Sequence, residues 1–141
     1  MLPGLVAAAL LAGCGSASVQ PWTGPPRPDA DGRIAVEAFN DYLGDHEEYA
    51  SSPEALASEF LGLAHHSAAI TSIVTREPPE GGPRASVAVV LDGLPDDSVR
   101  SARYLLTTSR QGDSWRLDTA RGAVRCRVGR GHLAFSTAPC V

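Results

Sequence analysis

The C-terminal run of the chain holds two arginines and a histidine among glycines. Arg127, Arg130 and His132 lie close together in sequence, and Gly129 and Gly131 flank Arg130. Guanidinium groups bind carboxylate or phosphate bidentately, so these side chains predict a contact for an anion or an anionic partner. The alternative is that the glycines form turns, Arg130 pairs with a carboxylate of a helix and His132 bonds to the backbone.

The adjacent histidines His65 and His66 are the next candidates for site chemistry. Neighbouring side chains point to opposite faces of a strand and diverge on a helix, so this pair cannot converge on one ion. A zinc site needs three or four converging ligands, and we therefore predict no metal site and no cofactor. His65 would act as a general base only in a pocket that also held a carboxylate such as Asp41 or Glu59.

The sequence carries no motif for a nucleophilic enzyme. Neither a Gly-x-Ser-x-Gly sequence nor the Gly-Lys-Ser/Thr of a phosphate-binding loop is present. We therefore favour a non-enzymatic role.

The segment Leu11-Ala12-Gly13-Cys14 follows a short apolar run and resembles the lipobox of a bacterial lipoprotein precursor. The resemblance implies cleavage after residue 13 and attachment of a diacylglyceryl group to the Cys14 sulfur. The apolar run is far shorter than the roughly 20 residues of a membrane-spanning helix. Because two acyl chains hold a protein stably on a bilayer, we expect a lipid-anchored protein on the extracytoplasmic face of the cell membrane.

Residues 1–13 would then be the signal peptide, although they contain no Lys or Arg. A signal peptide begins with positive charge, so we expect the true start codon to lie upstream and this segment to be truncated at its start. The alternative is an apolar N-terminal tail in which Cys14 is an ordinary thiol.

The chain has three cysteines, and lipidation of Cys14 would leave Cys126 and Cys140 as a pair. Extracytoplasmic compartments are oxidising, so we predict a disulfide between these two residues. Closing a loop of about 15 residues stabilises a protein by on the order of 3 kcal/mol in the chain-entropy account. Two free buried thiols or half of a metal site are the alternatives.

The last part of the chain also resembles a group of small uncharacterised exported bacterial proteins. The shared features are a Trp-containing strand, a cysteine, Gly-Arg-Gly-His, Phe-Ser and a closing cysteine; here they are Trp115, Cys126, residues 129–132, Phe135-Ser136 and Cys140. The resemblance implies a recurring disulfide-closed loop and no particular activity.

The net charge of −4 hides an uneven distribution of charge. Residues 29–61 contain nine acidic residues and one Arg, whereas residues 98–141 contain eight Arg and two Asp. The simpler interpretation is an acidic helical layer over a basic sheet, with surface charges that offset each other. The alternative is a basic face for an anionic partner such as phospholipid headgroups or cell-wall polymer. Nucleic acid is not expected in this compartment.

Composition divides the remainder of the chain into a tether and a domain. Residues 14–31 are rich in Gly and Ser and then in Pro, which predicts an extended, lipidated tether that includes Trp22. Residues 32–141 are expected to form a single domain of ordinary size.

Apolar spacings of three and four residues predict two helices at the start of this domain. The first covers residues 33–45, with Asp31 as its N-cap and Gly44 as its stop. The second opens at Ser51-Ser52-Pro53-Glu54, a strong helix-start signal. One long kinked helix is the alternative.

From residue 64 the period changes to the alternation that is typical of strands. We predict strands over residues 65–76, 84–94 and 99–110, a hairpin turn at residues 111–113 and a further strand from Trp115. Gly122 is expected to bend this last strand, and residues 123–126 either continue it or form a fifth strand.

These elements predict an α+β fold, with one or two N-terminal helices packed on a four- to five-stranded antiparallel sheet. Their order resembles that of the cystatin-like and NTF2-like folds, although no motif is shared and fold alone does not set function.

We therefore expect an accessory domain that binds a protein or polymer of the cell envelope through its Arg-rich strands and C-terminal loop. The alternative is a small ligand carrier or enzyme with a pocket between helix and sheet. Polar residues that converge in a pocket would favour the alternative. A sheet face plugged by aromatic side chains would favour the binding domain; the expected plugs are Phe39, Phe60, Tyr104 and Trp115.

Overall fold

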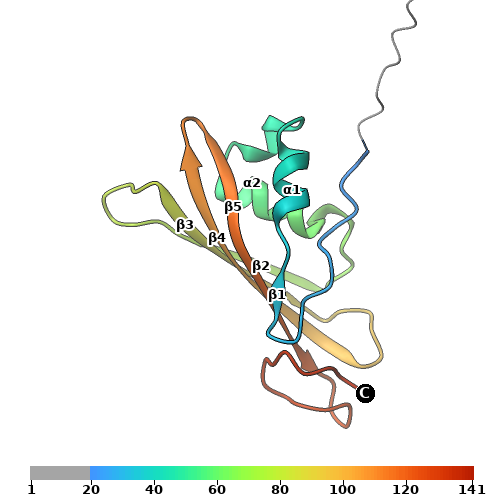
Figure 1. Cartoon of the computed structure of the whole chain (residues 1–141). Coiled ribbons are helices and arrows are strands. Elements are labelled where there is room, and N and C mark those ends of the chain that lie inside the picture. The colour runs from blue at the N-terminus through green and yellow to red at the C-terminus, as the bar shows by residue number, and fades with distance from the viewer. Residues whose placement is uncertain (1–19) are drawn as a thin grey trace, which may run out of the picture.

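Alternating apolar and polar residues form the long strands of the protein, whose computed structural model describes residues 20–141. The strands make one antiparallel sheet in the order β1-β5-β4-β3-β2, with the helices on one of its faces (Figure 1). The predicted α+β class is confirmed. In chain order the elements are β1 (Arg33–Ile34), α1 (Glu37–Leu43), the 3-10 helix η1 (Glu47–Ala50), α2 (Pro53–Leu61), the 3-10 helix η2 (Leu63–His65), β2 (Ile70–Arg76), β3 (Arg84–Asp92), β4 (Val99–Gln111) and β5 (Ser114–Cys126).

One face of the sheet, the inner face, is apolar and packs against the helices. Leu106 of β4 lies between Val87 of β3 and Ala120 of β5, and all three side chains are buried. Phe39 of α1 and Phe60 of α2 belong to the same core, are fully buried and have ring centroids 5.0 Å apart. Burial of each of these large apolar side chains stabilises the folded state by roughly 2–3 kcal/mol. This interface therefore holds the helices on the sheet.

The opposite face of the sheet, which we call the outer face, has no helix over it in residues 20–141. Cα partners in an antiparallel sheet point to the same face, so the register defines the residues of this face. One row across the sheet consists of Arg33, Arg121, Leu105, Ala88 and Val74, and the next of Ala123, Arg103, Val90 and Ser72.

The first helix begins later than predicted. Arg33 and Ile34 pair with β5 as a short strand, and α1 starts only at Glu37. Asp31 is not its N-cap: the N-cap is Val36, whose N–H donates to the Glu37 carboxylate over 3.0 Å. Pairing with a distant strand has overridden the local helical spacing at residues 33 and 34.

A turn held by Asp29 and Gly32 directs this segment onto β5. The Asp29 carboxylate accepts the N–H groups of Asp31 and Arg33. Gly32 has φ +79°, and a Cβ added there would lie 2.7 Å from the carbonyl oxygen of Gly122, so glycine is required for this close approach. β5 is continuous from Ser114 to Cys126, so residues 123–126 continue the strand and do not form a separate one.

The second helix is separate from the first and starts within the predicted signal. Ser52 is its N-cap and accepts the N–H of Ala55 over 3.1 Å, and Pro53 follows in the first turn. The predicted hairpin turn is also present, with Gly112 at φ +64° in the first position of a two-residue loop between β4 and β5. β2 begins at Ile70 rather than at residue 65, because His65 ends the 3-10 helix η2.

Trp22 packs on the helices and is not a free tether residue, contrary to our prediction. Its indole Nε1–H donates to the carbonyl oxygen of Phe60 over 2.8 Å, and its ring centroid lies 5.0 Å from that of Phe39. The Pro-rich segment is therefore fixed to the domain from residue 22 onward. Within residues 20–141, no helix combines the length and apolar character needed to cross a bilayer.

Replacement of Trp22 by Ala should lower the free energy of unfolding by about 2–4 kcal/mol, because it removes partly buried aromatic surface and a hydrogen bond to the α2 backbone. Trp22→Phe keeps the aromatic packing and should cost about 1 kcal/mol. Urea denaturation monitored by circular dichroism measures both values. An unfolding free energy that is unchanged in Trp22→Ala would show that the segment is not part of the folded unit.

Candidate functional site

The predicted disulfide between Cys126 and Cys140 is present. Cys126 is the last residue of β5 and is 1% exposed, so the covalent bond fastens the C-terminal loop to the end of the sheet. The backbone groups of Ser136 and Val124 exchange two hydrogen bonds of 2.9 Å and hold the middle of this loop beside β5.

His132 serves the internal structure of the C-terminal loop. Its Nδ1 lies 2.8 Å from the carbonyl oxygen of Ala134, and its Nε2 lies 2.8 Å from that of Ala138. The ring therefore bridges two parts of the loop backbone, as the alternative interpretation of this histidine expected.

Arg127 is also committed to backbone groups. Its guanidinium donates to the carbonyl oxygens of Leu94 and Asp96, each over 2.7 Å, and so ties the β3–β4 loop to the C-terminal loop. Arg130 is exposed, and its side chain has no hydrogen bond or ion pair within residues 20–141. Of the three residues predicted to contact an anion, Arg127 and His132 are bonded to backbone oxygens, and only the Arg130 side chain has no partner within the described residues.

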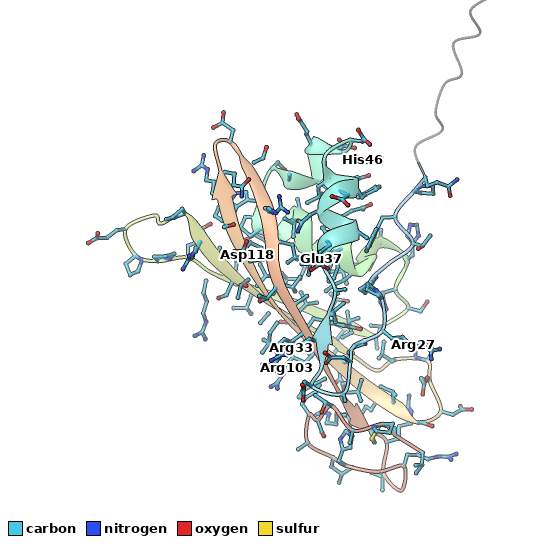
Figure 2. All side chains as sticks on the ribbon, in the orientation of Figure 1. Arg27, Arg33, Glu37, His46, Arg103 and Asp118 are labelled. Carbon is cyan, nitrogen blue, oxygen red and sulfur yellow. A yellow bond between two sulfur atoms is a disulfide. The ribbon has the colours of Figure 1, made fainter. Side chains whose placement is uncertain are left out.

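The outer face carries a cluster of arginines that the sequence interpretation did not single out as a site. Arg103 of β4 and Arg125 of β5 both lie over the ring of Phe135, with guanidinium carbons 4.7 and 5.3 Å from its centroid. These are cation–π contacts between the sheet and the C-terminal loop. Figure 2 shows Arg33 and Arg103 near β1, below the helices, and Arg27 on the other side of the N-terminal segment.

Arg125 is neutralised within this cluster. One of its Nη atoms lies 3.3 Å from the Asp92 carboxylate and 3.0 Å from the Ser101 hydroxyl. The hydrogen bond from Ser101 lowers the pKa of Asp92, and the charges of Arg100 and Arg125 lower it further. Asp92 is thus an anion at neutral pH and is already shared between two arginines.

Arg103, Arg121 and Arg33 have no carboxylate partner within the described part of the chain. The Nε of Arg103 is buried without a hydrogen-bond acceptor, and Arg121 donates only to the backbone oxygen of Asp31, over 2.9 Å. The ion pairs of residues 20–141 join Arg100 and Arg125 to Asp92, and Arg110 to Asp113. None of them joins an acidic residue of the helices to an arginine of the sheet, so the charges of the two layers do not offset each other by direct contact.

A cavity of about 280 Å³ lies where the outer face meets the C-terminal loop. We call it the arginine hollow. Its guanidinium groups come from Arg103 and Arg121, its aromatic wall is Phe135, and Ser136, Thr137 and Asp31 supply the other polar groups. The guanidinium and hydroxyl groups of this lining match a carboxylate or phosphate group, because they donate hydrogen bonds to anionic oxygens. The Asp31 carboxylate is the one lining group that would repel an anion.

The interface between the helices and the sheet is filled by side chains. Phe39 and Phe60 are 0% exposed, and the partly buried rings of Tyr104 and Trp115 pack against the same core. This is the arrangement that favours a binding domain over a carrier or enzyme with an internal pocket.

His65 and His66 are exposed and line a separate opening of about 630 Å³ beside Trp22 and Asp96. Glu59, a carboxylate considered as a partner of His65, instead accepts the hydroxyl of Tyr42 over 2.8 Å. Burial, with that hydrogen bond, raises the pKa of Tyr42 to about 12. Asp96, the carboxylate in this opening, accepts the N–H groups of Ser98 and Val99, and within residues 20–141 no carboxylate is hydrogen-bonded to His65.

The two disulfide sulfurs and a ring nitrogen of His132 lie within 4.8 Å of one another. Metal binding requires thiolates, and both sulfurs are bonded to each other. This cluster therefore offers no metal site while the disulfide is intact.

Comparisons of the chain with protein-family models, with curated proteins and with solved structures found no match.

Replacement of Arg127 by Ala should lower the free energy of unfolding by about 1–2 kcal/mol, since two charge-assisted hydrogen bonds to Leu94 and Asp96 are lost. Arg130→Ala removes the same charge but no such bond and should change stability by less than about 0.5 kcal/mol. Thermal denaturation of both variants measures the difference. Equal effects would mean that Arg127 does not hold the β3–β4 loop.

Proposed function

We propose that this protein is a lipid-anchored, non-enzymatic binding domain on the extracytoplasmic face of the cell membrane, and that it binds an anionic protein or polymer of the cell envelope. The binding surface is the outer face of the sheet, centred on the arginine hollow. The observation that carries the proposal is the set of outer-face guanidinium groups without carboxylate partners, on a protein whose helix–sheet interface is filled.

The charge distribution supports an anionic ligand. Arg33 and Arg121 are direct Cα partners in neighbouring strands, an arrangement in which like charges repel each other. Arg103 adds a third cation on the same face, although the chain as a whole has a net charge of −4. A bound anion would relieve this repulsion.

The geometry also supports a preorganised contact. Phe135 lies beneath the guanidinium planes of Arg103 and Arg125, so the donor atoms of these flexible side chains are held in place before a ligand arrives. Side chains that are fixed in advance lose less conformational entropy on binding. A polymer with repeated carboxylate or phosphate groups would engage the hollow and the neighbouring arginines of the face together.

The membrane anchor is the part of the proposal that lies outside the described residues. Its support is the Leu11-Ala12-Gly13-Cys14 sequence, together with the disulfide, which is typical of proteins in oxidising compartments. Seven residues separate Cys14 from Trp22, the first side chain seen to pack on the domain. Such a segment spans at most about 30 Å, so the domain would act close to the bilayer.

A ligand carrier or enzyme is the less supported role. It requires polar groups that converge in a pocket between helices and sheet, where Phe39 and Phe60 are instead fully buried.

The double variant Arg103→Ala/Arg121→Ala should bind anionic polymers about tenfold or more weakly than the parent, because each arginine supplies charge-assisted hydrogen bonds. Inorganic polyphosphate and poly-L-glutamate serve as phosphate and carboxylate probes, and isothermal titration calorimetry at low salt measures their affinity. Binding should weaken with added salt, as expected for exposed ion pairs.

The matched control is Arg110→Ala/Arg116→Ala, which removes the same charge at the hairpin end of β4 and β5, away from the hollow. An equal loss of affinity in this control would mean that binding follows net charge and not the arginine hollow. No binding of either probe by the parent would contradict the proposed role.

The lipid anchor has its own test, which does not depend on the ligand. When the full chain is expressed in a bacterium behind an intact signal sequence, it should fractionate with membranes, and its intact mass should include a diacylglyceryl group on Cys14. Cys14→Ser should release the protein from the membrane fraction. An unacylated parent that fractionates in the same way as Cys14→Ser would contradict the anchor.

A further inference from the structure

β2 is an edge strand, and the edge that points away from β3 is unpaired within residues 20–141. It pairs with β3 along its whole length, from Ile70 opposite Asp92 to Arg76 opposite Ser86, and no other described strand lies beside it. Every residue of β2 except Thr75 is exposed. Its free backbone N–H and C=O groups are therefore available to another strand.

This edge lacks the features that usually prevent strand addition. Its seven residues include no proline, the one charged residue is Arg76 at its end, and its register with β3 contains no bulge. Ile70, Ile73 and Val74 are 63%, 39% and 49% exposed, which makes the edge the main concentration of exposed large apolar side chains in the sheet. Such exposure is typical of an interaction surface.

We propose that β2 pairs antiparallel with β2 of a second copy of this chain, about a twofold axis at Ile73, to form a dimer with one continuous ten-stranded sheet (five strands from each copy). This inference stands independently of the proposed anion-binding function.

The sequence of β2 is self-complementary in this register. An axis at Ile73 pairs all seven residues, whereas an axis at any other residue leaves at least two of them without a partner. Ile73 then faces Ile73 of the second copy, and Thr71 faces Thr75, two pairings that are favourable across antiparallel strands. Ser72 faces Val74, and Ile70 faces Arg76.

Charge complementarity also favours a second copy in this orientation. Ile70 lies directly beside Asp92 on the outer face, so Arg76 of the second copy would extend that row toward an acidic residue. His65 and His66 precede β2 in the chain, while Glu77 and Glu80 follow it. Antiparallel pairing brings Glu77 and Glu80 of each copy next to His65 and His66 of the other, whose ring N–H groups are able to donate hydrogen bonds to carboxylates.

The test is the oligomeric state of the full chain, measured by sedimentation equilibrium over a range of protein concentrations. The parent should show a monomer–dimer equilibrium. Ile73→Lys places two ammonium groups opposite each other and removes apolar contact, so its dissociation constant should rise about tenfold or more. Val128→Lys adds the same charge to an 86% exposed residue of the C-terminal loop and should leave the dissociation constant unchanged.

If Ile73→Lys lowers the melting temperature more than Val128→Lys does, Val74→Lys, at a residue on the outer face of β2, provides the same test of dimerisation. A parent that stays monomeric at all concentrations would overturn the proposal. So would a dimer that both β2 variants leave intact.

Cysteine cross-linking tests the twofold axis itself. In a Cys14→Ser background, Ile73→Cys should form an intermolecular disulfide under mild oxidation, because direct cross-strand partners lie within disulfide distance. Val128→Cys should not. If residues 1–19 or an unrelated extended peptide occupy the edge instead, Ile73→Cys will remain monomeric and the proposal fails.

Discussion

The structure depends on the burial of one face of an antiparallel sheet beneath two short helices. Phe39, Phe60 and Leu56 are completely buried in this interface, and Trp22 covers their edge through its bond to the α2 backbone. Neither helix is longer than nine residues, so tertiary packing and not helix propensity must stabilise them. This packing buries the apolar face of β3, β4 and β5 and leaves their polar face exposed to solvent.

That division decides where the arginines lie. The helix–sheet interface is filled by side chains, whereas the outer face carries arginines that the acidic helices cannot reach from the other side of the sheet. The only carboxylate that pairs with outer-face arginines in the described residues is Asp92, and it serves Arg100 and Arg125. Acidic and basic residues that could offset each other in the sequence are thus separated by a sheet in the fold, which gives an acidic protein one basic face.

Local patterns predicted those features of the fold that local physics controls. Alternation located β3 and β4, Gly112 marked the hairpin, and the start signal at Ser52 and Pro53 opened α2. The errors fall where distant segments meet. Arg33 and Ile34 form a strand only because β5 lies beside them, and Trp22 is buried only because α1 and α2 receive it.

The arginine hollow was beyond sequence reasoning for the same reason. Alternation does place Arg103 on the polar face of β4, but nothing local indicates that Phe135, 32 positions later in the chain, lies under its guanidinium. The disulfide and the two bonds between Ser136 and Val124 bring that ring into place. A chain whose cysteines were still reduced would keep its arginines but lose part of the support that fixes their aromatic wall. The aromatic wall of the hollow therefore depends on a covalent bond between Cys126 and Cys140 that forms only under oxidising conditions.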